Sequence, residues 1–211
     1  MQRQRHTRRT LLRAFAAVGA GLVGWPLTAR AAPEDAARVV SELAGQTITL
    51  ISDSEMSRTE RAERLQILIG RGFDTESIGR FVLGRHWQAA DETQRAKFIE
   101  LFRSYTALSY ARRFEAYSGQ RLAVTGSRDI STKDSTRALV HTQLSDKDGA
   151  PVKVDWRLRH GDDGWRIYDV IVENVSMVLT QKSEFAAVIE RSGGNLQPLL
   201  DQLRERMKKM A

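Results

Sequence analysis

Residues 151–194 read PVKVDWRLRHGDDGWRIYDVIVENVSMVLTQKSEFAAVIERSGG, and this stretch contains two strand patterns, a turn and a helix. From Val152 to Arg159 apolar and polar residues alternate, which is typical of a half-buried strand. Gly161-Asp162-Asp163-Gly164 follows, and glycine and aspartate tolerate the backbone angles of a tight hairpin turn. The returning run, Trp165 to Glu173, has apolar residues on both faces, so it must be covered on both sides or line a cavity.

The rest of the chain adds helices and two more strands around this hairpin. Helical spacing predicts helices over residues 34–52, 57–69, 74–84, 92–117, 178–191 and 196–209, with a capping box at Ser57-Arg58-Thr59-Glu60. Strand patterns near 121–128, 136–145, 151–160 and 164–173 are joined by short polar turns, which predicts an antiparallel meander. We therefore expect an α+β fold: a curved four-stranded antiparallel sheet with several helices packed on one face.

The N-terminus has the composition of a secretory signal peptide. Five arginines between residues 3 and 13 precede an apolar run from Ala14 to Leu27, and Ala29-Arg30-Ala31 forms an A-x-A cleavage site. The apolar run is too short to span a bilayer comfortably. Residues 7–13, TRRTLLR, resemble a twin-arginine export signal, with an ordinary secretory signal as the alternative. We expect residues 1–31 to be removed near Ala31 and residues 32–211 to form one domain in the periplasm.

Most of the positive charge belongs to this leader. The chain carries 33 basic and 26 acidic residues, a net charge of +7, but residues 1–31 contain six arginines and no acidic residue. Removing those six leaves 27 basic against 26 acidic side chains. Nucleic-acid binding, which a basic protein otherwise favours, therefore loses its main support. The absence of cysteine excludes disulfides, thiolate metal sites and cysteine nucleophiles.

The sequence shows no catalytic motif. His86, His141 and His160 fall in three different predicted elements, and none has a second ligand at metal-binding helical spacing. A nucleophile elbow, a phosphate loop and a dinucleotide-binding fingerprint are all missing from the sequence. We predict neither a metal nor a cofactor.

Asp155 and Asp169 are the one carboxylate pair that needs weighing, because they lie on adjacent predicted strands. Paired carboxylates can perform acid–base catalysis. Asp155 lies between Lys153 and Arg157 on a polar face, however, and Asp169 is within reach of Arg137 or Arg157. Cross-strand ion pairs are the simpler interpretation, so we predict that the protein is not an enzyme.

Two blocks of sequence carry a family resemblance. The first is the pattern PV-x-VDWRL, W-x-IYDV-x-VE and VSMV-x-T-x-KSEF-x-x-VI-x-x-x-GG, and the second comprises FVLGRHW at 81–87 and ETQRAKF at 92–98 with Phe102. Together they closely resemble the MlaC-like (toluene-tolerance) periplasmic phospholipid-binding proteins over residues 34–208. The chain departs from the family pattern at Asn174, where glycine is expected, and at Thr180-Gln181, where Asn-Tyr is common. These departures leave the hopanoid-associated branch of the family as an alternative.

The resemblance implies both a fold and a role. It implies a cystatin- or NTF2-like sheet with an apolar pocket between sheet and helices, where the acyl chains of a phospholipid bind with the head group left in solvent. It further implies a monomeric carrier, the binding component of an ABC transport system that maintains lipid asymmetry. Its partners would be an inner-membrane ABC transporter with its MCE-domain protein and an outer-membrane lipoprotein complex. A hopanoid-associated carrier, a non-catalytic envelope adaptor without ligand, and an NTF2-like enzyme remain as alternatives.

The residues expected to contact the lipid are the apolar ones of the long helix, the last two strands and the helix that follows. Singly, aromatic residues at helical spacing are usually core, and only their combined excess over what a two-layer domain needs points to a pocket. The expected lining consists of Phe102, Tyr105, Leu108, Val154, Trp156, Ile167, Val170, Val172, Met177 and Phe185. The expected rim, for a head group or a partner surface, consists of Arg80, Arg85, Arg112 and Arg113.

Overall fold

The computed structural model describes residues 31–114, 119–145 and 149–210. Residues 1–30 of the predicted signal peptide and the last residues of the helix predicted to reach 117 lie outside these ranges. Within them the helices are α1 Pro33–Ile51, α2 Arg58–Gly72, α3 Thr75–Leu83, α4 Arg85–Ala89, α5 Glu92–Phe114, α6 Met177–Arg191 and α7 Gln197–Met210. The strands are β1 Arg121–Asp129, β2 Arg137–Ser145, β3 Val152–Gly161, β4 Gly164–Val172 and β5 Val175–Ser176. No helix in this part of the chain is both long and apolar enough to cross a membrane.

Most helix starts follow from local capping. The Ser57 hydroxyl accepts a hydrogen bond from the Glu60 amide at 3.2 Å, but the Glu60 carboxylate pairs with Arg64 instead of reaching back to Ser57. Only half of the predicted capping box is therefore present. Asp74 caps α3 in the same way, by accepting from the Ser77 amide.

The five strands form one antiparallel sheet in the order β1-β2-β3-β4-β5, which confirms the predicted meander. Two short elements, α4 and β5, were not predicted. The backbone turns into β5 through Glu173 and Asn174, with φ angles of 47° and 66°. Asparagine adopts this left-handed region more readily than most residues, so Asn174 takes the place where the family pattern led us to expect glycine.

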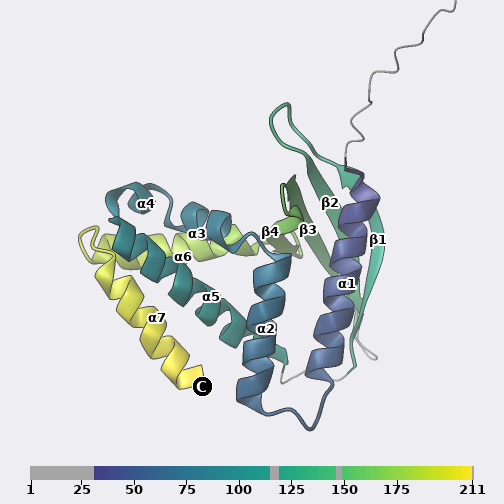
Figure 1. The fold of residues 1–211 in the computed structure, drawn as a ribbon, viewed down its shortest axis with the longest axis horizontal. Helices are drawn as coiled ribbons and strands as arrows, with labels where there is room; N and C mark the ends of the chain where they lie inside the picture. Colours follow the sequence, from purple (N-terminus) through teal and green to yellow (C-terminus); the bar gives the residue numbers. More distant parts are fainter. Residues whose placement is uncertain (1–30, 115–118, 146–148, 211) are drawn as a thin grey trace, which may run out of the picture.

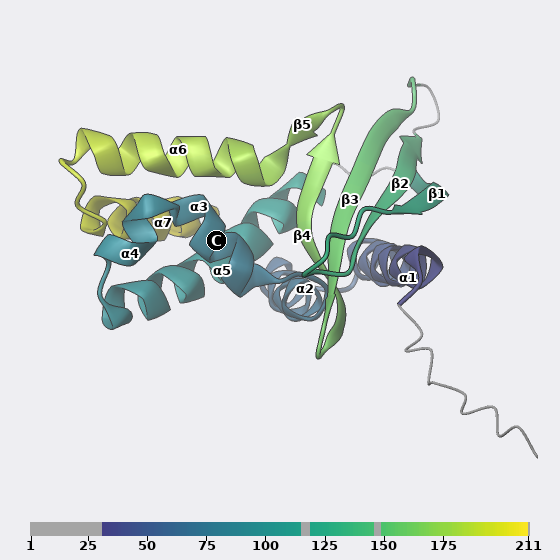
Figure 2. The same cartoon turned by 90° about the horizontal axis from the view of Figure 1, so that it is seen from above.

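The helices lie on both faces of the sheet rather than on one. Figures 1 and 2 show α1 along one face, while α3, α5, α6 and α7 gather beyond β4. Beneath α1, Ala36 and Val40 pack against Ala138, Val140 and Leu158 in what we call the sheet cluster. The opposite side of β4 meets α3 and α6. Trp165, Ile167, Val170 and Val172 of β4 all lie at the sheet cluster, whereas Tyr168 packs on the side of α3 and α6.

A second core, the helical cluster, lies among α3, α5, α6 and α7. The rings of Phe98, Phe102 and Phe185 meet at its centre, with centroid separations of 5.6, 5.9 and 6.2 Å. Leu199, Leu200 and Leu203 of α7 complete the cluster. A third, smaller cluster joins α1, α2 and α5 around Leu65. The domain thus has an apolar core on each side of β4.

Candidate functional site

A cleft of about 510 Å³ opens where α3 and the start of α6 face the polar side of β3 and β4. Its apolar wall comes from the two helices and consists of Ile78, Phe81, Val178 and Leu179. Its cationic floor comes from the sheet and consists of Arg137, Arg157 and Arg159. Phe81 and Leu179 are 46% and 52% exposed, which is high for large apolar side chains. Such a cleft suits a ligand that has both an apolar and an anionic part.

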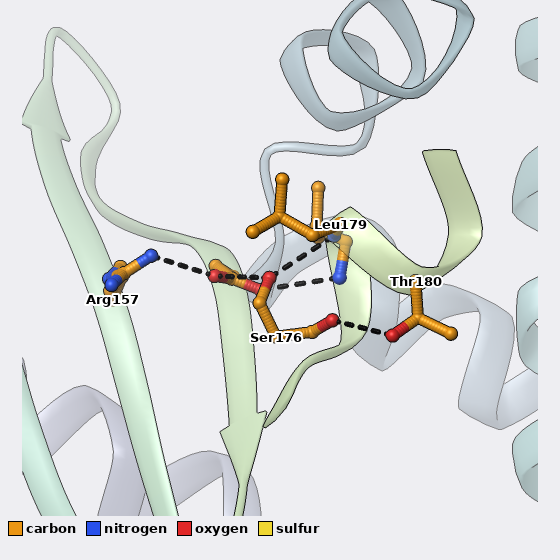
Figure 3. Close-up of polar contacts among 6 residues, drawn as sticks. Arg157, Ser176, Leu179 and Thr180 are labelled. Carbon is orange, nitrogen blue, oxygen red and sulfur yellow. Dashed lines mark hydrogen bonds and ion pairs between the residues drawn. The ribbon is translucent and has the colours of Figure 1, made fainter. Parts of the chain in front are cut away.

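Asp169 fastens the start of α6 to the sheet beside this cleft. Its carboxylate is 4% exposed and accepts hydrogen bonds from the Ser176 hydroxyl at 2.9 Å, the Val178 amide at 3.3 Å and Arg157 Nη1 at 3.1 Å. Ser176 in turn accepts from the Leu179 amide and so caps α6 (Figure 3). Of the two partners considered for Asp169, Arg137 and Arg157, the structure shows Arg157. With its acceptor capacity taken up, Asp169 has a structural role.

Asp155 is occupied in a similar way on the same face of the sheet. His141 Nδ1 lies 2.8 Å from one of its oxygens across the β2–β3 ladder, and Lys153 Nζ lies 3.2 Å from the other. Burial of the carboxyl raises the pKa of Asp155, but the hydrogen bonds of His141 and Lys153 outweigh burial, and the pKa falls below its ordinary value of 3.8. Each carboxylate therefore has its own hydrogen-bond and ion-pair partners, which is a structural arrangement rather than an acid–base pair.

A second and more open cleft, of about 890 Å³, lies at the turns of the sheet. It is bounded by the β1–β2 and β3–β4 connections and by the segment between α2 and α3, and Arg159 lines both clefts. Its lining is almost entirely polar and charged, which does not suit an apolar ligand. Among the residues that the structure describes, no group of three His, Asp or Glu side chains is placed to hold a metal ion.

The ten predicted lining residues divide among the three clusters. Phe102 and Phe185 are buried in the helical cluster, and Tyr105 packs against it. Leu108 packs against the small third cluster instead. The other six belong to the sheet cluster or pack against it, on the side that α1 covers, and these are Val154, Trp156, Ile167, Val170, Val172 and Met177.

The cleft itself is lined by residues that the sequence did not single out. Ile78 connects the cleft to part of the predicted lining, because it belongs both to the cleft wall and to the helical cluster that holds Phe102 and Phe185. Phe81 and Leu179 stand within the quoted family blocks, and the alternation of residues 156–159 already assigns Arg157 and Arg159 to one face. Which helices cover that face depends on tertiary packing, so the sequence alone did not identify the cleft.

The predicted rim arginines whose side chains the structure describes are not gathered at one place. The Arg80 guanidinium lies 5.6 Å from the ring centroid of Trp87. Arg85 forms an exposed ion pair with Glu190 at 2.6 Å. Arg112 is exposed in the last turns of α5, and the side chain of Arg113 lies outside the described part of the structure.

Comparisons with known proteins agree with the sequence blocks. A family model described as MlaC protein matches residues 41–205. The intermembrane phospholipid transport system binding protein MlaC of Haemophilus influenzae is 23% identical over 121 residues, and the chain spans just over half (56%) of that protein's length. The toluene tolerance protein ttg2D of Pseudomonas putida is 22% identical over 165 residues, which cover 74% of this chain and 75% of that protein.

The fold has a close counterpart among solved structures. A phospholipid-binding protein from Ralstonia solanacearum, solved in complex with a phospholipid, superposes with a TM-score of 0.69 at 24% sequence identity. The match covers 83% of this chain and 98% of that chain. It confirms the predicted α+β fold, with an antiparallel sheet packed against helices.

Proposed function

This chain belongs to the MlaC protein family, and on that premise we propose that it is a carrier that binds a phospholipid by its acyl chains. The observation that carries the proposal is the cleft between α3, α6 and the sheet, where an apolar wall stands opposite three arginines. Family membership also supports the prediction that the chain is not an enzyme. The names of the two relatives refer to phospholipid transport and toluene tolerance, which favours a phospholipid over a hopanoid as cargo.

The need for a carrier follows from the hydrophobic effect. Each buried methylene contributes about 0.8 kcal/mol, so exposing two chains of ~16 carbons to water costs on the order of 20 kcal/mol. A protein that covers the same methylenes offsets most of this cost. Release to a membrane or partner then requires contacts that favour an opened or emptied state of the protein.

The chains would enter along the apolar wall of the cleft. At about 510 Å³ the cleft is comparable with pockets for drug-sized ligands, so two acyl chains require α3 and α6 to move apart. Because Ile78 connects the wall to the helical cluster, this movement brings Phe102, Tyr105 and Phe185 into contact with the chains. The six sheet-side candidates face α1 and would be reached only if α1 were displaced.

Location and partners complete the proposal. The predicted signal peptide places the mature protein in the periplasm, and the name of the Haemophilus relative describes a transport system that acts between membranes. We propose that this chain is the corresponding monomeric component. It would exchange lipid with an outer-membrane lipoprotein complex and with an inner-membrane ABC transporter that carries an MCE-domain protein.

Native mass spectrometry of the mature protein, from Ala32, tests the binding proposal directly. We expect a mass excess that extracts as a two-chain phospholipid. A protein purified without lipid that takes up none from liposomes would overturn the proposal in favour of an adaptor or an enzyme, and a hopanoid mass would reassign the cargo. Leu179→Asp should abolish lipid binding, whereas Ile67→Asp, at a site outside the cleft with a matching exposure of 54% against 52%, should not.

A further inference from the structure

The cationic floor of the cleft contains an unfavourable charge arrangement. Arg137 and Arg159 are direct partners in the β2–β3 register, and Arg157 lies on the same side of β3. Like charges directly opposite each other destabilise an antiparallel pair. A fold that places three arginines together needs negative charge nearby to offset this cost.

The carboxylates beside the cleft supply only part of that charge, because each one serves two positive groups. Asp169 pairs with Arg157 and also accepts hydrogen bonds from Ser176 and the Val178 amide at the start of α6. Asp74 pairs with Arg159 and also caps the start of α3 through the Ser77 amide at 3.2 Å. A helix N-terminus carries about half a positive charge. Two carboxylates are thus shared among three arginines and two helix ends.

Arg137 is the arginine left without a carboxylate. Its Nε donates to the Ser135 hydroxyl at 3.1 Å, and its guanidinium lies 5.8 Å from the ring centroid of Tyr168. These contacts hold the side chain in place without neutralising it. Within the described ranges, no Asp or Glu oxygen lies within ion-pair distance of Arg137, which lines the floor of the cleft.

We infer that Arg137, supported by Arg157 and Arg159, binds the phosphate of the lipid head group inside the cleft. The planar guanidinium matches phosphate oxygens in a bidentate geometry, and a phosphate anion removes the charge conflict between Arg137 and Arg159. The inference rests on the proposed function and differs from the expectation that the head group stays in solvent. Since an additional ammonium group would approach the same arginines, the cleft selects phospholipids of net negative charge over zwitterionic ones.

Competition between two lipids tests this selection. The delipidated mature protein is incubated with vesicles of equal phosphatidylglycerol and phosphatidylethanolamine content with identical chains, and the captured lipids are quantified by mass spectrometry. We expect wild type to prefer phosphatidylglycerol and Arg137→Gln to reduce that preference by about tenfold, through weaker capture of phosphatidylglycerol. Arg128→Gln removes the same charge from β1, outside the cleft, and should behave as wild type.

Each other outcome has a distinct meaning. Captured lipid without a preference in wild type, or with the same preference in Arg137→Gln, would overturn the inference and leave the carrier proposal intact. Wild type that captures no lipid would overturn the carrier proposal itself. Stabilisation of the delipidated protein by inorganic phosphate, with no lipid preference, would assign the arginines to free phosphate instead. The same competition at two ionic strengths needs no variant. The preference of wild type for phosphatidylglycerol should weaken when the salt concentration rises from about 0.05 to 0.5 M, and a salt-independent preference would contradict the inference.

Discussion

Truncation of Phe185 to alanine removes one of the three rings at the centre of the helical cluster. Phe185 is 2% exposed and meets Phe98 and Phe102 edge to face, with centroids 5.9 and 6.2 Å away. Deleting a buried phenylalanine costs about 3–5 kcal/mol, and each aromatic pair adds about 0.5–1.5 kcal/mol beyond area burial. Two such pairs place Phe185→Ala in the upper half of the first range, at about 4 kcal/mol.

Chemical denaturation of the delipidated protein, followed by circular dichroism, measures this loss without any contribution from bound ligand. For a domain of this size, about 4 kcal/mol corresponds to a decrease in Tm of roughly 8–16 °C. Leu179→Ala provides the control, because the side chain is 52% exposed and its removal should change stability by less than about 0.5 kcal/mol. A loss below about 1.5 kcal/mol for Phe185→Ala would refute the packing of the three rings described above.

Three further predictions concern polar groups. Asp169→Asn should lower the free energy of unfolding by about 2 kcal/mol in a urea titration. The loss is smaller than for a fully buried ion pair because the Arg157 side chain is 41% exposed. An unchanged midpoint would count against the role of Asp169 at the start of α6. The lowered pKa of Asp155 means that its ionised form stabilises the fold at neutral pH and that this contribution is lost as the pH falls below 3.8 through the folded-state pKa. Asp155→Asn should therefore be less stable than wild type at pH 7 and approach it at a pH of about 2, and a difference independent of pH would contradict the prediction. Ser57→Ala should cost about 1 kcal/mol by loss of the α2 cap in the same titration, whereas Ser54→Ala, before the helix, should cost almost nothing.

Local patterns were enough to predict most of the elements. The six long helices and four long strands begin and end within a few residues of the positions that periodicity and capping indicate, wherever the structure describes them. Asp91, for example, accepts from the Gln94 amide at 2.7 Å and caps α5, which begins at Glu92 as predicted. The distribution of the helices over two faces was not predictable in this way, because it depends on which side of β4 each helix packs against.

One residue of β4 also affects the side of the candidate site that this strand forms. In a regular strand Ile167 and Asp169 would point to the same face. In the structure Arg157 pairs with Asp169 while Leu158 pairs with Ile167, so Tyr168 has no partner and forms a bulge. The bulge directs Ile167 towards α1 and leaves Asp169 on the side of α6.

The same bulge places the Tyr168 ring beside Arg137, at the cleft. Strict alternation therefore misassigns the residues on one side of position 168. The predicted lining combined two clusters for another reason: its strand residues all lie at the sheet cluster, whereas Phe102, Tyr105 and Phe185 come from helices whose packing the sequence does not fix. A bulge shifts the alternation of its own strand by one residue, so that Trp165 and Ile167 are followed at the sheet cluster by Val170 and Val172. The bulge thus decides how Tyr168 and Asp169 meet the cleft, whereas the arginines of its floor follow the regular β2–β3 register.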